Sequence, residues 1–204
     1  MSDSISPLSQ DFHLEKFVDP IRTADGQARA SVALTGLTTL WFNTGTLCNL
    51  ECVNCYIESS PKNDRLVYLT LADVLPYLDE IARDGLSVTE IAFTGGEPFM
   101  APEIMPILDE VLARGFEALV LTNAMRPMMK LQEPLLALQA RYGDRLTLRV
   151  SLDHYTAGLH EDVRGPHSWK PTINGLRWLA TNGFRLSLAG RTRWQEDEAT
   201  AREG

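Results

Sequence analysis

Three cysteines, all that the chain contains, lie within eight residues in the segment CNLECVNC. Cys48, Cys52 and Cys55 offer soft thiolate ligands, close enough together to bind three irons of an iron–sulfur cubane and leave the fourth iron without a protein ligand. A zinc site is the alternative, and it would need a further ligand such as His154, His160 or another histidine. A disulfide with a spare thiol is a third alternative, although three crowded cysteines do not suit a secreted disulfide framework.

A second segment with chemical potential is Gly95-Gly96-Glu97-Pro98. Two glycines and a proline by themselves are typical of an ordinary turn. Glycines also let a backbone approach a ligand closely, and a carboxylate such as Glu97 accepts charge-assisted hydrogen bonds from an ammonium group. The segment is therefore a candidate for binding a cationic ligand, with the turn as the alternative.

From about residue 38 onward, short apolar runs alternate with longer amphipathic ones, and strand ends recur about every 30 residues. This pattern predicts parallel βαβ units wound into a barrel or sheet. Apolar residues recur at helical spacing over residues 71–81 and 104–112, for example. Pro76, Pro106, Pro134 and Pro171 predict helices that begin late or are kinked. The expected strands are TLWFNT ending near Thr44, VTEIAFT ending at Thr94, ALVLT ending at Thr122, LTLRVSL ending at Leu152 and RLSLA ending at Ala189.

The chemically distinctive residues follow the ends of these strands. The cysteines come after the first strand and the GGEP segment after the second. Asn123 follows the third, while Ser151 and Asp153 flank the end of the fourth. Because the carboxyl ends of parallel strands share one face, where active sites are built, we expect these segments to meet in one pocket.

Composition favours a soluble, cytoplasmic protein with one main domain. A chain of 204 residues with 44% hydrophobic content can bury one core. Its 27 acidic and 19 basic residues give a net charge of −8, which offers no general attraction for nucleic acid or an anionic membrane. The chain contains neither a signal-peptide pattern nor an apolar run of the roughly 20 residues that span a bilayer.

The two motifs together resemble those of the radical S-adenosylmethionine (SAM) superfamily. CNLECVNC matches the family's CxxxCxxC motif, and FTGGEPF matches its GGEP motif, in the same order and spacing. The resemblance covers roughly residues 38–190 and implies an α/β fold, a partial barrel of parallel strands. It also implies a [4Fe-4S] cluster on Cys48, Cys52 and Cys55, whose open iron is chelated by the methionine part of SAM.

The resemblance further implies roles for other residues. Gly95, Gly96, Glu97 and Pro98 would contact the methionine ammonium group. Ser151 and Asp153, in SLDHYTAGLHEDVRG, look like the segment that contacts the ribose and carboxylate in one branch of the family, and Arg164 joins this set. The backbone of Tyr56 would help to position adenine, with a packing role as the alternative. Asn123 faces the cofactor or caps the turn that LTNA begins.

The sequence departs from the family at Asn54, where an aromatic residue is common, and at His154, where glycine is common. His154 is a proton donor near the pocket or an exposed or capping residue.

The implied activity is reductive cleavage of SAM to methionine and a 5′-deoxyadenosyl radical, which abstracts hydrogen from a substrate. The SLD segment resembles a branch with peptide-modifying and cofactor-maturing enzymes, so the substrate is a small molecule or a peptide. No catalytic residue of the protein is assigned. An electron donor such as flavodoxin or ferredoxin would be the partner. The alternatives are a non-catalytic iron–sulfur or zinc-binding module, and a truncated, inactive relative.

The expected organisation has three parts. Residues 1–37 are an N-terminal extension in which ARASVAL is an additional edge-strand candidate, residues 38–190 are the core, and residues 191–204 are a polar tail that begins a helix. Radical SAM cores commonly have six βα units, whereas five strands are expected here. The fifth strand would then be an exposed edge. This leads to the hypothesis that the chain is truncated, or that a partner or further region completes the pocket.

Overall fold

The computed structural model describes residues 15–33, 35–191 and 196–203. The chain divides into two compact units, residues 1–36 and 37–204. In the described part of the first unit, Arg22 and Ala28 form an isolated antiparallel bridge across a turn at Gly26, and residues 29–33 form no strand. The additional strand expected in ARASVAL is therefore absent from these residues, while Leu34 lies outside the described part.

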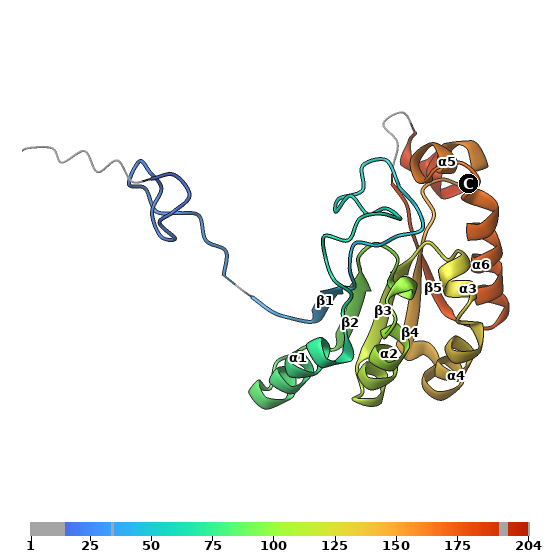
Figure 1. The fold of residues 1–204 in the computed structure, drawn as a ribbon, viewed down its shortest axis with the longest axis horizontal. Helices are drawn as coiled ribbons and strands as arrows, with labels where there is room; N and C mark the ends of the chain where they lie inside the picture. The colour runs from blue at the N-terminus through green and yellow to red at the C-terminus, as the bar shows by residue number, and fades with distance from the viewer. Residues whose placement is uncertain (1–14, 34, 192–195, 204) are drawn as a thin grey trace, which may run out of the picture. The chain divides into compact units, whose positions relative to one another are not determined.

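The second unit is built on a sheet of five parallel strands in the order β1-β2-β3-β4-β5 (Figure 1). Every pair of neighbouring strands is parallel, which agrees with the expected partial barrel. Each strand also ends within one residue of its expected last residue. The bounds are β1 Thr39–Asn43, β2 Glu90–Thr94, β3 Glu117–Thr122, β4 Leu146–Ser151 and β5 Arg185–Ala189.

Helices connect successive strands, as parallel pairing requires. The main ones are α1 Leu71–Asp84, α2 Ile104–Ala113, α4 Gln132–Tyr142 and α6 Trp169–Thr181. Shorter elements are η1 Pro98–Met100, α3 Arg126–Met129, η2 Gly143–Arg145, α5 Ala157–Arg164 and α7 Glu198–Glu203. Proline was expected to delay the start of a helix or to kink it. In α2, α4 and α6 the proline is the third residue, so each of these helices begins just before its proline. Pro76 instead lies inside α1, which begins with a capping box between Thr70 and Asp73.

The two faces of the sheet differ in polarity. Strand β4 shows this directly, because Leu146, Leu148 and Val150 are buried in the core while Thr147 and Ser151 alternate with them and stay half-buried. The register continues the apolar row across the sheet through Phe42, Phe93, Val120 and Leu148. One face thus packs against the helices, and the other remains available for a site.

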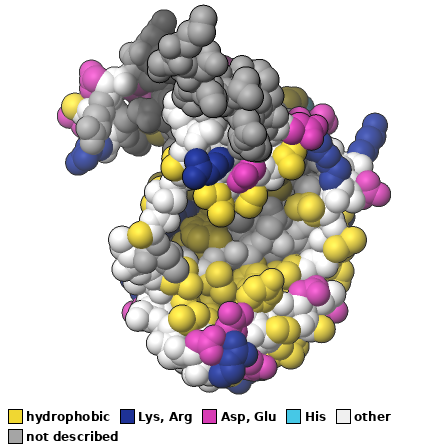
Figure 2. All heavy atoms as spheres, turned by 90° about the vertical axis from the view of Figure 1, so that its left-hand side faces the viewer, with side chains coloured by type: hydrophobic (Ala, Val, Ile, Leu, Met, Phe, Trp, Pro, Cys, Tyr) yellow, Lys and Arg dark blue, Asp and Glu magenta, His cyan; other side chains and the backbone are white. Residues whose placement is uncertain are grey.

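Both edges of the sheet carry exposed hydrophobic side chains. Trp41 on β1 is 45% exposed and Leu188 on β5 is 57% exposed. Figure 2, seen from the side that carries β1, shows hydrophobic side chains gathered on that face. After β5, the regular element within the described residues is α7, so no sixth strand follows in this part of the chain. None of the described helices is long and apolar enough to cross a membrane.

Candidate active site

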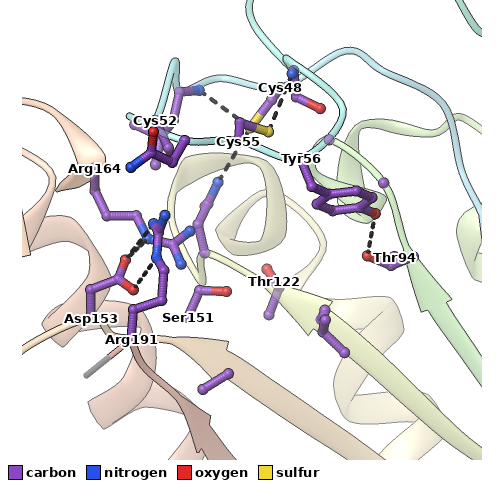
Figure 3. A pocket seen from close by; sticks show the side chains of 18 of the residues that line it. Cys48, Cys52, Cys55, Tyr56, Thr94, Thr122, Ser151, Asp153, Arg164 and Arg191 are labelled. Carbon is purple, nitrogen blue, oxygen red and sulfur yellow. Dashed lines mark hydrogen bonds and ion pairs between the residues drawn. The ribbon is translucent and has the colours of Figure 1, made fainter. Parts of the chain in front are cut away.

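A cavity of about 390 Å³ lies at the carboxyl ends of the strands. Its volume falls within the roughly 300–1,000 Å³ range of small-molecule sites. All three cysteines line it, together with Thr94 at the end of β2 and Ser151 at the end of β4. Figure 3 shows the cysteines along one wall, facing Thr122 and Ser151. The structure therefore brings together segments from the ends of all five strands, four of which the sequence predicts.

The loop after β1 that carries the cysteines is held by backbone pairing. Leu47 and Ser60 form a parallel bridge, and the Cys48 amide donates to the Ser60 carbonyl at 3.2 Å. Asn54, in the left-handed region with φ of 60°, turns the chain between the second and third cysteines. Asparagine tolerates this conformation better than most residues. The departure from the aromatic residue expected at this position thus has a local structural reason.

The sulfur atoms have different surroundings. Cys48 is buried, which raises the pKa of its thiol to about 12, and its Sγ accepts a hydrogen bond from the Leu50 amide at 3.4 Å. The Cys55 Sγ accepts one from the Ser59 amide at 3.3 Å. Burial also raises the pKa of Cys52, although the positive charge of Arg164 works against this. All three thiols are free, and within the described residues no three ligand side chains are already arranged as a metal site.

Gly95 and Gly96 let the GGEP segment pack against the cysteine loop. Backbone hydrogen bonds continue here beyond the paired strands β1 and β2. The Gly96 amide donates to the Gly45 carbonyl at 2.9 Å, and the Glu97 amide donates to the Leu47 carbonyl at 3.1 Å. A Cβ at Gly96 would lie 2.1 Å from the Leu47 oxygen, which is far inside van der Waals contact. The close approach expected of these glycines is therefore made to the chain's own cysteine loop, while both also line the cavity.

Glu97 is fully buried and lies behind the cavity wall rather than on it. Its Oε1 accepts hydrogen bonds from the Thr122 hydroxyl at 2.8 Å and the Phe99 amide at 3.2 Å, and its Oε2 accepts one from the Asn123 amide at 2.8 Å. The carboxylate thus joins the ends of β2 and β3. Burial raises the pKa of Glu97 to about 7 despite these three hydrogen bonds. Pro98 is likewise absent from the cavity wall.

The raised pKa of Glu97 makes stability depend on pH. Because the folded chain holds the proton more tightly than the unfolded chain, the carboxyl group stabilises the fold fully below about pH 4.5 and loses this contribution as pH rises through about 7. We expect the difference in unfolding free energy between the native chain and Glu97→Gln to change by about 3 kcal/mol over this interval. Urea unfolding of the metal-free chains at several pH values measures it. A difference that is independent of pH would contradict the assignment.

Asn123 closes the turn after β3 and also lies on the cavity wall. Its Oδ1 accepts a hydrogen bond from the Met125 amide at 3.0 Å, which closes the turn after β3. Its Nδ2 donates to the Asn49 Oδ1 at 2.9 Å, and the residue lines the cavity. Tyr56 also lines the cavity, and its hydroxyl is hydrogen bonded to that of Thr94 at 3.1 Å.

Asp153 is engaged by two arginines. Its Oδ2 accepts a hydrogen bond from the Arg164 Nε at 2.5 Å, and the Arg191 Nε donates to Oδ1 at 2.8 Å. Burial alone would raise the pKa of Asp153, but the hydrogen bonds and charges of Arg191 and Arg164 outweigh it, so the pKa is lowered. Asp153, Arg164 and Ser151 all line the cavity, as the sequence predicts.

Neither His154 nor His160 lines the cavity. His154 interacts through Nε2 with Glu196 at 3.2 Å and accepts a hydrogen bond at Nδ1 from the Thr156 amide at 2.9 Å. His160 is buried against Trp169, and within the described residues its two ring nitrogens have no hydrogen-bond partner. Of the histidines considered for the zinc alternative, His154 and His160 are therefore not on the cavity wall with the cysteines.

Thr94, Thr122 and Arg191 line the cavity but were not singled out as site residues in the sequence. Each lies at or just after the end of a strand, at β2, β3 and β5 respectively. The rule that placed Asn123 and Ser151 at the site applies equally to them. Arg191 instead falls in the segment predicted to be a polar tail, because residues 191–204 are polar and charged and contain no apolar run.

The sequence model described as "Radical SAM superfamily" matches residues 42–192, most of the chain. The chain belongs to the radical SAM superfamily. The matched region contains all five strands apart from the start of β1, and it contains every cysteine. Enzymes of the radical SAM superfamily use a [4Fe-4S] cluster and SAM.

Individual relatives agree with this membership. The antilisterial bacteriocin subtilosin biosynthesis protein AlbA of Bacillus subtilis is 31% identical over 143 residues, which are 70% of this chain and 30% of AlbA. The mycofactocin maturase MftC of Mycobacterium tuberculosis is 30% identical over 137 residues, 67% of this chain and 33% of MftC. The chain thus spans about a third of the length of these curated relatives.

A solved structure shows the same fold. Streptococcus suis SuiB, in a crystal structure bound to S-adenosylmethionine, superposes with a TM-score of 0.65 over 83% of this chain and 37% of SuiB. The identity is 16%, so the likeness concerns the fold. It agrees with the partial barrel.

Proposed function

We propose that this chain holds a [4Fe-4S] cluster on Cys48, Cys52 and Cys55, binds SAM in the adjoining cavity, and acts as a radical SAM enzyme. The observation that carries the proposal is the convergence of the three thiols with the glycines of GGEP and the end of β4 on one cavity. When bound, the cluster supplies the electron that cleaves SAM to methionine and a 5′-deoxyadenosyl radical.

The residues present fit these cofactors. Thiolates are the preferred ligands of iron–sulfur clusters, and three of them lie on one wall. Ser59, also on the cavity wall, has a buried hydroxyl with no hydrogen-bond partner among the described residues. Because buried polar groups are normally hydrogen bonded, an unpartnered one beside a cavity supports a ligand there.

Other residues of the cavity would bind and orient SAM. We assign the backbone of Gly95 and Gly96 to the methionine part, and Ser151 to the ribose or carboxylate. Tyr56 and Asn123 would contribute to the remaining wall. For Glu97 we propose an indirect role in place of the expected contact with the ammonium group. It fixes the ends of β2 and β3 through its three hydrogen bonds, and thereby shapes the wall that SAM meets.

For the substrate we propose a peptide or a small molecule. AlbA is named for the biosynthesis of a bacteriocin, MftC is named a maturase, and one SuiB structure contains its precursor peptide SuiA, all of which favour a peptide. An electron donor such as flavodoxin or ferredoxin would supply the reducing equivalent. The site is proposed to work in the cytoplasm, where thiols stay reduced.

Anaerobic reconstitution with iron and sulfide tests the proposal. We expect about four irons per chain, because three thiolates serve one cubane and the sequence holds no cysteine for a second. Adding SAM should change the electron paramagnetic resonance signal of the reduced cluster. A strong reductant should then give 5′-deoxyadenosine. Stable binding of zinc without uptake of iron would refute the proposal.

A further inference from the structure

Arg191 links three distant parts of the chain. Its Nε and Nη2 donate to the two carboxylate oxygens of Asp153, at 2.8 and 3.1 Å. Its Nη1 donates to the carbonyl oxygen of Val53 at 3.0 Å. Val53 lies directly between Cys52 and Asn54. The guanidinium, two residues after the end of β5, thus joins Asp153, two residues after the end of β4, to the turn between two cysteines. Figure 3 shows Arg191 beside Asp153, with Arg164 adjacent.

The same turn is held from its other side by α5. The Val53 amide donates to the Val163 carbonyl at 2.9 Å, and the next residue, Arg164, donates to Asp153. Both backbone groups of Val53 are therefore tied to structure that converges on Asp153. The Asp153 side chain is only 2% exposed and that of Arg164 16%, whereas the Arg191 side chain is 42% exposed, so the carboxylate is shielded from water while Arg191 reaches it from the solvent side. We call Asp153, Arg164, Arg191 and the Val53 backbone the clasp.

The clasp anchors the part of the cysteine loop around Cys52 to distant segments of the chain. Cys48 is secured by pairing to Ser60, and the Cys55 sulfur is bonded within its own turn by Ser59. For residues 51–55, the hydrogen bonds to distant segments within the described part of the chain are the two made by Val53. The position of Cys52 thus depends on the clasp.

The charges of the clasp suit this task. One carboxylate faces two guanidinium groups, which leaves an excess positive charge near Cys52 and Cys55. The interaction is mutual, because these two thiols also act on Arg191 electrostatically. Burial still raises the pKa of Cys52, so the clasp matters through the geometry that it imposes on the turn.

We propose that Arg191 is a positioning residue that, through the clasp, holds the Cys52–Cys55 turn in place for the cluster. The inference rests on the proposed function for the identity of the cluster, but the clasp itself belongs to the metal-free chain. Arg191 acts through the Val53 carbonyl and Asp153, not by contact with iron.

The test compares Arg191→Ala and Arg191→Lys with Arg185→Ala. Arg185 is a matched control, because it begins β5, the strand that Arg191 follows. Its contacts, an exposed hydrogen bond to the Asp144 carbonyl at 3.2 Å and an exposed 3.8 Å ion pair with Glu117, lie at the opposite end of that strand. In hydrogen exchange on the metal-free chain, residues 50–58 should exchange about tenfold faster in Arg191→Ala, the factor expected from one lost charge-assisted hydrogen bond. Exchange in β3 and α2 should stay unchanged in all variants, and Arg185→Ala should match the native chain throughout.

Reconstitution supplies the second measurement. Arg191→Ala should take up less than about half of the native iron and give an altered paramagnetic resonance signal, because the cluster is negatively charged and its loop is released. Arg191→Lys keeps the positive charge but lacks the planar guanidinium that donates to several oxygens at once. This variant should therefore take up more iron than Arg191→Ala and less than the native chain. Native exchange in residues 50–58, or a native signal with full iron, in Arg191→Ala would overturn the proposal. Should that variant fail to fold, Asp153→Asn carries the same test. If the native chain itself takes up no iron, the proposed function fails, whereas the exchange result still decides whether the clasp exists.

Discussion

Replacing Cys52 with alanine should abolish both cluster uptake and production of 5′-deoxyadenosine. Two remaining thiolates cannot hold three irons of a cubane, and the described residues offer no neighbouring ligand arranged to replace the third. The fold should survive, since Cys52 is only half-buried and does not belong to the hydrophobic core. Iron content after anaerobic reconstitution, the paramagnetic resonance signal and the assay for 5′-deoxyadenosine measure the effect.

Lys62→Ala is the matched control for this experiment. Lys62 is exposed in the same loop and lies outside the cavity, so its loss should leave iron content and the signal as in the native chain. Circular dichroism of both metal-free variants separates loss of the cluster from loss of the fold. A Cys52→Ala variant that still bound about four irons would mean that the cubane does not depend on this thiol.

The strands could be predicted because local pattern and global fold agree. In β4, LTLRVS alternates buried apolar residues with half-buried polar ones. This alternation in the sequence predicts a strand and also shows which residues lie on each of its faces. The rule that carboxyl ends share one face then placed Asn123 and Ser151 at the same cavity, where the structure has them. The departure in ARASVAL has a local cause as well. Its first residue, Ala28, is used in the bridge to Arg22, and the strand that starts the sheet begins only at Thr39.

The environment of Glu97 could not be read from the motif. A carboxylate after two glycines has the chemistry to bind an ammonium group, and the sequence gives no sign of whether it faces a ligand or the protein. Its partners Thr122 and Asn123 are about 25 residues away and reach it only because β2 pairs with β3. Long-range pairing therefore decides what a motif residue contacts.

Asp153 illustrates the same limit at longer range. Its position after β4 indicated a cavity residue, and it is one, but both carboxylate oxygens are engaged by Arg164 and Arg191. The second arginine is 38 residues away in the sequence and follows another strand. Any contact of Asp153 with a ligand must therefore be made in the presence of two guanidinium groups, or by displacing one.

Replacing Gly175 with alanine should destabilise the fold by about 3 kcal/mol, near the upper end of what overpacking usually costs. Helix α6 packs closely against the turn after β3, where the Thr172 hydroxyl donates to the Asn123 carbonyl at 3.2 Å. A Cβ at Gly175 would lie 1.8 Å from the carbonyl oxygen of Ala124. The contact is with backbone, so no flexible side chain can move aside. Ala124 already has a φ of 57°, which leaves its turn little freedom to adjust.

Gly158→Ala separates this clash from the general effect of replacing glycine. Gly158 is exposed in α5, and nothing lies within 4 Å of the position its Cβ would take, so alanine there should be neutral or stabilise the helix by up to about 1 kcal/mol. Urea unfolding of both variants gives the two free energies. Because α6 supports the turn that carries Asn123, Gly175→Ala should also weaken SAM binding in a calorimetric titration of the reconstituted protein, while Gly158→Ala should not. If Gly175→Ala proved as stable as Gly158→Ala, the close packing of α6 on this turn would be refuted.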